Sequence, residues 1–209
     1  YMPYNSPKEV KFVGEGSTAF ITNDKVTISD ASSLSFTTGG LTVMAWVKMT
    51  DATNFPIISK GIYNTSGEWW FITQAADKLH FNLFDESVAS CYIGQRSTSA
   101  ITAYEGEWVH VVGTYDGNAT SSGVILYLNG TVLPSDTFEN NAGSFVAMEN
   151  LAADVIIGEY NTNFANGSMK NVAIWNRTLS PTEIQNVMHK TYIDLSGTLT
   201  SGLVSWWAL

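Results

Sequence analysis

The chain has 209 residues, of which 44% are hydrophobic, 12% aromatic and only 14% charged, and its formal net charge is −9. The aromatic content excludes a disordered chain. Ten Lys and Arg residues scattered through an acidic chain form no basic surface, so nucleic acid and anionic membranes are poor partners. No apolar run is long enough for membrane insertion.

In chain order, residues 1–9 are expected to form a linker, because this segment contains Pro3 and Pro7. Short apolar runs then alternate with turn residues, a pattern that predicts an all-β sandwich. The predicted strands are residues 10–13, 19–21, 41–49, 56–59, 69–73, 79–84, 91–95, 108–115, 124–133, 155–158 and 169–175.

Residues 78–83 alternate between polar and apolar side chains, which indicates a half-buried strand. Leu79, Phe81 and Leu83 are expected to face the core, and His80 and Asn82 to face outward. Residues 42–47 are apolar on both faces of a strand, which predicts a central position in a sheet covered on both sides.

One helix is predicted near the C-terminus. Ser180 has the position of an N-cap, Pro181 that of the first helical residue, and Glu183 that of the third, as in a capping box. Ile184 and Val187, with Met188, give the helix one apolar face.

Three groups of segments occur in a characteristic order. They are LTVMAWVK at residues 41–48; EWVHVVGTYDG at 107–117 with LYLNG at 126–130; and VIIG at 155–158 with NVAIWNR at 171–177 and LSPTEI at 179–184. Together they resemble the laminin-G-like and pentraxin-like domains of the concanavalin A-like lectin/glucanase superfamily. The resemblance covers residues 10–190. It implies a jelly-roll β-sandwich of two antiparallel sheets with one short C-terminal helix, whereas function is less constrained, because one fold hosts many functions.

The tail, residues 191–209, begins as a polar linker and ends in the apolar segment LVSWWAL at 203–209. This segment resembles the strand that opens such a domain. Two alternatives follow: the tail begins the next of several tandem modules, which we favour, or it fills an edge-strand position in this domain or a neighbour. In either case an apolar strand is expected to pair, because a free one promotes aggregation.

Catalysis is not expected. Glycoside hydrolases need two positioned carboxylates, and those of this superfamily carry them on one strand. Glu105 and Glu107 are the only candidates here, and they precede a strand in a turn. Cys91, the only cysteine, is expected to be a core residue, and His110, between two valines of a strand, a structural one.

Calcium is a candidate ligand by resemblance. Pentraxin-like domains build a calcium site from two loops, which correspond here to residues 63–68 and 159–163. These loops offer carboxylate and amide oxygens, the ligands that calcium prefers. The candidate ligands are Asn64, Glu68, Glu159, Asn161 and Asn163. The alternative is that both loops are ordinary polar turns. An acidic pair common in the family's last strand is replaced by Lys170 and Asn171.

Sugar binding requires an exposed aromatic ring beside hydrogen-bonding groups. Trp69 and Trp70 are neighbours in a predicted strand, so their side chains point to opposite faces. One is expected in the core and the other, Trp70, on a ligand-binding surface; the alternative is that loops bury both. The other candidate ligand residues are His80, Asn82, Tyr92 and Arg96. Trp46, Trp108 and Trp175 are expected in the core.

These observations predict a non-catalytic recognition module that acts outside the cell or on a virion surface. Its expected partner is a glycan or a surface protein, with adhesion as the role. The alternative is a structural decoration or spacer in a multi-domain surface or phage protein, which makes protein contacts and binds no sugar.

Overall fold

The computed structural model of the chain describes residues 17–209, except residues 22 and 142. The predicted linker, residues 1–9, and the predicted strand at residues 10–13 lie outside the described residues. No helix within the described part has the length and apolar character that a membrane span requires.

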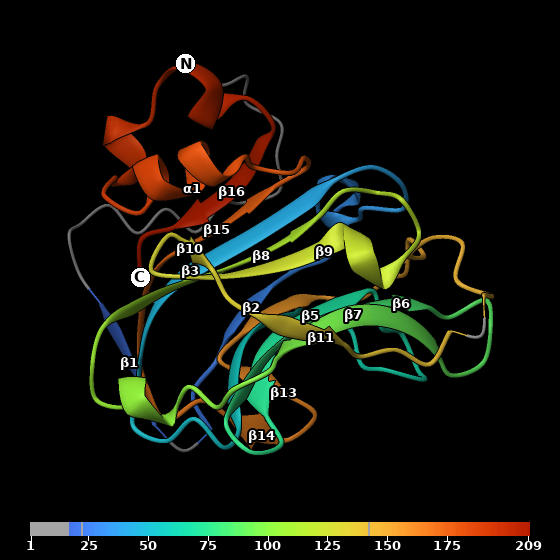
Figure 1. Ribbon diagram of the computed structural model, residues 1–209, viewed down its shortest axis with the longest axis horizontal. Helices are drawn as coiled ribbons and strands as arrows, with labels where there is room; N and C mark the ends of the chain where they lie inside the picture. The colour runs from blue at the N-terminus through green and yellow to red at the C-terminus, as the bar shows by residue number, and fades with distance from the viewer. Residues whose placement is uncertain (1–16, 22, 142) are drawn as a thin grey trace.

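Two antiparallel sheets of seven strands pack face to face and confirm the predicted sandwich (Figure 1). Sheet A has the order β1–β15–β3–β8–β9–β10, with β16 also paired to β15. Its strands are β1 (Thr18–Phe20), β3 (Leu41–Met49), β8 (Val109–Tyr115), β9 (Val124–Leu128), β10 (Thr131–Val132), β15 (Gly167–Trp175) and β16 (Leu203–Trp207).

Sheet B has the order β11–β7–β6–β5–β4–β12–β2. Its strands are β2 (Val26–Ile28), β4 (Phe55–Lys60), β5 (Trp69–Gln74), β6 (Lys78–Asp85), β7 (Cys91–Ser97), β11 (Ser135–Thr137) and β12 (Val155–Ile157). A separate hairpin of β13 (Glu159–Tyr160) and β14 (Asn163–Phe164) follows β12. The strands β2, β11, β13 and β14 are absent from the prediction. Each has only two or three residues, too few to show an alternating pattern.

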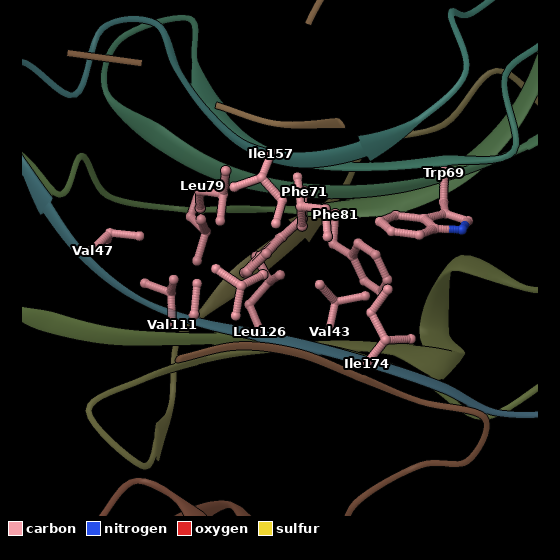
Figure 2. Close-up of a cluster of buried hydrophobic side chains, with 14 of the residues drawn as sticks. Val43, Val47, Trp69, Phe71, Leu79, Phe81, Val111, Leu126, Ile157 and Ile174 are labelled. Atoms are coloured by element: carbon pink, nitrogen blue, oxygen red, sulfur yellow. The ribbon is translucent and has the colours of Figure 1, made fainter. Parts of the chain in front are cut away.

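The main core lies between the sheets (Figure 2). Side chains of both sheets point into this space, among them Val43, Val47, Val111, Leu126 and Ile174 from sheet A and Trp69, Phe71, Leu79, Phe81 and Ile157 from sheet B. Leu79, Phe81 and Leu83 are fully buried there, as their alternation predicts. Cys91 also belongs to this core.

A second apolar cluster covers the outer face of sheet A. It is formed where helix α1 (Pro181–Val187) and the C-terminal segment pack over β3, β8, β9 and β15 (Figure 1). Trp175 is fully buried in this cluster, as predicted, and its Nε1 donates to the carbonyl of Leu199 at 2.8 Å. The predicted capping box is present: Ser180 Oγ accepts from Glu183 N, and Glu183 accepts from Ser180 N.

The tail returns to its own domain. Strand β16 pairs with β15 along the same edge that β1 pairs with, β1 next to residues 167–169 and β16 next to residues 172–175. Trp207 and Leu209 are thereby buried in the main core. Of the two alternatives for the tail, the structure contains the edge strand within this domain.

The expectation that Trp46 and Trp108 are core residues is wrong. Both indoles are half-buried, and the ammonium group of Lys170 lies 5.7 Å from the ring centre of Trp46 and 4.7 Å from that of Trp108. Strand periodicity shows which face of a sheet a side chain lies on, but it does not show how much of that face another element covers. Helix α1 covers only part of the outer face of sheet A, so side chains on the rest of this face stay partly exposed.

Candidate functional site

The five side chains expected to contact a ligand lie on the face of sheet B that is turned away from the core. The pairing of β5, β6 and β7 places Trp70 opposite Asn82, and His80 opposite Arg96. Tyr92 lies two residues before Gly94, which is opposite Asn82. Since residues opposite each other on antiparallel strands project to the same face, the strands bring all five side chains together.

A row of aromatic rings crosses this outer face of sheet B. The ring centre of Trp70 lies 4.5 Å from that of Tyr160 and 5.6 Å from that of Phe84. Phe84 lies 6.1 Å from Tyr92, which lies 5.6 Å from Phe138. Trp70, Tyr92 and Phe138 are half-buried, so the row is partly open to solvent.

Four aromatic residues of this surface are missing from the sequence-based prediction. Phe84 could have been found, because it continues the alternation of His80 and Asn82. The others lie in a loop or in very short strands, where no periodicity marks their orientation. The four are Tyr63, Phe84, Phe138 and Tyr160.

His80 and Asn82 point away from the core, as predicted, but both are fully buried and not open to solvent. The segment that follows β11 lies over them: the ring of Phe138 packs against His80 at 4.9 Å, and Asn82 Nδ2 donates to the carbonyl of Phe138 at 3.0 Å. A side chain at Gly94 would collide with the Asn82 amide, because its Cβ would lie 2.6 Å from Nδ2. Only glycine therefore leaves room for this contact.

Several buried polar atoms on this face have no hydrogen-bond partner among the described residues. They are Trp70 Nε1, both ring nitrogens of His80, Asn82 Oδ1 and Arg96 Nε. Burial lowers the pKa of His80 to about 4, with Arg96 as a second cause, so its imidazole is neutral at pH 7. Unpartnered buried polar groups are costly, and bound ligand or water would supply the missing partners.

A hollow of about 310 Å³ adjoins one end of the aromatic row. Tyr160 belongs to both features, since it stacks against Trp70 and lines the hollow. Its hydroxyl accepts from the Tyr63 amide at 3.2 Å, and burial raises its pKa to about 12, so the hydroxyl keeps its proton at neutral pH. The other lining residues include Ser59, Ser66, Asp154, Glu159 and Asn161.

Glu68, expected as a calcium ligand, is instead the buried partner of Lys60. Lys60 Nζ lies 3.3 Å from Glu68 Oε1, 2.6 Å from Asp30 Oδ1 and 2.6 Å from the carbonyl of Ala153. Glu68 Oε1 also accepts from the amide of Leu151 at 3.0 Å. Burial raises the pKa of Glu68 to about 7, although the Lys60 ammonium lowers it. The cluster joins three loops, and two of them line the hollow.

The other expected calcium ligands differ in their surroundings. Glu159 and Asn161 both line the hollow, but the carboxylate of Glu159 accepts from the Thr162 amide and pairs with Lys25 at 3.4 Å. Asn64 and Asn163 are exposed. Across the described part of the chain, no group of three or more His, Cys, Asp or Glu side chains could hold a metal ion. Calcium binding by these residues stays a prediction.

The two carboxylates considered for catalysis lie elsewhere. Glu105 Oε1 accepts from the Ala52 amide at 2.8 Å, and Glu107 is exposed. Both precede β8, which belongs to sheet A, so neither lies on the outer face of sheet B.

The fold and this surface can be compared with known proteins. A laminin-G-type family profile, described as "Concanavalin A-like lectin/glucanases superfamily", matches residues 20–185. The chain belongs to this superfamily. A comparison with curated protein sequences gives no match.

Solved structures of this superfamily domain have low sequence identity to the chain. A putative carbohydrate binding protein from Bacteroides ovatus has 14% identity and a TM-score of 0.61, over 92% of this chain and 50% of that one. Domain 4 of AbnA, a GH43 extracellular arabinanase from Geobacillus stearothermophilus, was solved in complex with arabinotriose; it has 15% identity and a TM-score of 0.59, over 83% of this chain and 79% of that one. At these identities the likeness establishes the shared fold. The chain spans half the length of the Bacteroides protein.

Proposed function

We propose that this chain is a non-catalytic carbohydrate-binding domain whose ligand lies against the outer face of sheet B, beside Trp70. The observation that carries the proposal is made at Trp70, whose indole is half-buried and whose buried Nε1 has no hydrogen-bond partner among the described residues. A sugar offers an apolar C–H face to the ring and hydroxyls to the polar atoms.

The neighbouring groups suit a neutral ligand. His80 is uncharged, Tyr160 keeps its proton, and the amide oxygen of Asn82 has no partner in the part of the chain that the structure describes. The hollow beside Tyr160 provides space for a sugar ring, and the hydroxyl, amide and carboxylate groups that line it can bind sugar hydroxyls.

A binding role is also supported by the residues that point outward from β5, β6 and β7. The outward-pointing residues of these strands include Trp70, His80, Asn82, Tyr92 and Arg96. None of these five residues carries a carboxylate. Because glycoside hydrolysis needs a pair of carboxylates, these strands supply binding groups and no catalytic pair. The solved structures named above include a protein described as a putative carbohydrate binding protein and a domain of an extracellular enzyme; they support our inference that this domain acts outside the cell.

A glycan array with the purified protein tests the proposal. We expect one or more glycans to bind, and to bind equally in calcium and in chelator, because the two carboxylates expected to bind calcium, Glu68 and Glu159, already pair with lysines. Trp70→Ala should abolish binding. Tyr192→Ala serves as the matched control, because it removes an exposed aromatic ring from the segment that follows helix α1. This variant should leave binding unchanged.

Binding that survives Trp70→Ala would contradict the proposed face. Binding that is lost in chelator would restore the calcium site of residues 64 and 161. An array without any signal would favour the alternative function as a structural spacer, for which the partial covering of the face by Phe138 is the supporting observation.

A further inference from the structure

The outer face of sheet A carries a patch that the proposed glycan site does not use. Trp46 and Lys48 belong to β3, Lys170 belongs to β15, and Trp108 immediately precedes β8. The strand register places Lys170 opposite Trp46, and Ser168 opposite Lys48. Lys170, Trp46 and Lys48 therefore point to the same side of the sheet, away from the main core.

A β-bulge follows Lys170 in β15. The pairing of β15 with β3 shifts register between Lys170 and Ala173, and Asn171 has a φ of 50°. Met169 is buried in the main core, so Lys170, the next residue, points outward by ordinary strand alternation. Asn171 and Val172 together lie opposite Ala45, and this one extra residue returns Val172 to the core. Bulges commonly redirect a side chain in this way, and asparagine tolerates the left-handed conformation better than most residues.

Lys170 places a cation close to two indoles. Lys170 Nζ lies 4.7 Å from the ring centre of Trp108 and 5.7 Å from that of Trp46, within the range of cation–π attraction. Trp46, Trp108 and Lys170 are half-buried and Lys48 is exposed. The ion pairs between described residues are those of Lys25, Lys60 and Arg177, so neither lysine of this patch is neutralised by a carboxylate in the described part.

Beneath the patch lies a buried histidine, His110, whose ring nitrogens have no hydrogen-bond partner among the described residues. His110 is opposite Trp46 on β8 and fully buried, with its ring 5.4 Å from the indole. Burial lowers the pKa of His110 to about 3, so it is neutral, and the two lysines carry the charge of this patch.

We propose that Trp46, Lys48, Trp108 and Lys170 form a second ligand site, which binds a sugar residue carrying a carboxylate, such as a uronic acid. Two positive charges in a chain of net charge −9 select an anionic group locally, since charges farther away than about 8 Å are largely screened at physiological salt. The exposed part of the Trp108 ring offers a surface for the sugar ring. The site lies on the opposite sheet from Trp70 and stands whether or not the face of sheet B binds glycan.

The test compares two probes, the trisaccharide of galacturonic acid and its methyl ester, which has lost the negative charges and gained a methyl group on each carboxyl. Binding is measured by calorimetry and by the indole N–H signals of the 15N-labelled protein. We expect the acid to bind and to shift the Trp108 signal, and the ester to bind at least fivefold more weakly. Lys170→Gln should weaken binding of the acid roughly tenfold, because a charge-assisted contact contributes about 1.5 kcal/mol.

Two variants serve as controls. Lys78→Gln removes one positive charge from sheet B, and Trp70→Ala removes the proposed glycan platform; both should leave binding of the acid unchanged. The inference is overturned if neither probe binds, if acid and ester bind equally, if Lys170→Gln has no effect, or if the acid shifts the Trp70 signal and leaves that of Trp108 in place.

Discussion

Asn82 Nδ2 donates a hydrogen bond to the main-chain carbonyl of Phe138, at 3.0 Å. This contact joins the centre of sheet B to the segment that covers it, and it holds the Phe138 ring over His80. The row of aromatic rings on the outer face of sheet B is therefore covered by Phe138 at one end and adjoins the hollow at the other.

Asn82→Ala should release this cover. The variant leaves the Phe138 carbonyl without its side-chain partner and removes a buried amide, so we expect the free energy of unfolding to fall by about 1–2 kcal/mol. Amide exchange should accelerate at residues 138–140. Asn163→Ala, at an exposed position, is the control and should change neither quantity; equal exchange in Asn82→Ala and the unaltered protein would contradict the account.

Stability should depend on pH through Glu68. Its pKa is about 7 in the folded protein, above the ordinary value of 4.5, so the folded state retains a proton that the unfolded state has lost. The contribution of Glu68 is complete below about pH 4.5 and is lost as pH rises to about 7, which lowers the free energy of unfolding by about 2 kcal/mol.

Urea denaturation at several pH values measures this dependence. Glu68→Gln mimics the protonated form and should flatten the curve between pH 4.5 and 7, whereas Glu107→Gln, at an exposed carboxylate, should leave the slope in place. A slope that persists in Glu68→Gln would assign the titration to another group.

Glu183 should make the free energy of unfolding depend on pH in the acidic range, below about pH 4.5. Hydrogen bonds from Arg177, with bonds from the helix N-terminus, lower its pKa to about 2. Its contribution is present above about pH 4.5 and is lost as pH falls toward 2. Glu183→Gln should cost about 1 kcal/mol at pH 7, as other capping substitutions do, and the difference from the unaltered protein should vanish near pH 2. A difference that stays constant down to pH 2 would exclude the carboxylate as its cause.

Deletion of residues 196–209 should destabilise the domain and not merely shorten it. The deletion removes β16, opens the edge of β15 and takes Trp207 and Leu209 out of the main core. Removal of one buried aromatic side chain alone lowers the free energy of unfolding by about 3–5 kcal/mol. We therefore expect a much lower melting temperature, together with aggregation through the opened edge. A truncated protein with the same melting temperature and oligomeric state would show that the tail is a passive linker.

The alternation of residues 78–83 was sufficient to predict which side chains of β6 face the core. It could not predict that His80 and Asn82 are covered, because their cover comes from Phe138, in a segment with no periodic pattern of its own. Strand periodicity gives the face of a side chain, whereas burial depends on what another part of the chain places above it.

The same distinction explains the tail and the calcium residues. The apolar pattern of residues 203–209 predicted a strand that must pair, but a strand pattern carries no information about its partner. Glu68 has the residue type and loop position of a calcium ligand. Its burial beside Lys60 depends on a contact between two strands whose register the sequence leaves open.

The most direct test of the proposed glycan site is an indole N–H titration. The chain has seven tryptophans, and Trp69 and Trp70, adjacent in sequence, lie on opposite faces of β5, one in the core and one on the outer face. On titration of the 15N-labelled protein with the strongest glycan of the array, the Trp70 signal should shift in proportion to saturation while that of Trp69 stays in place. A glycan that binds without moving the Trp70 signal would contradict the account.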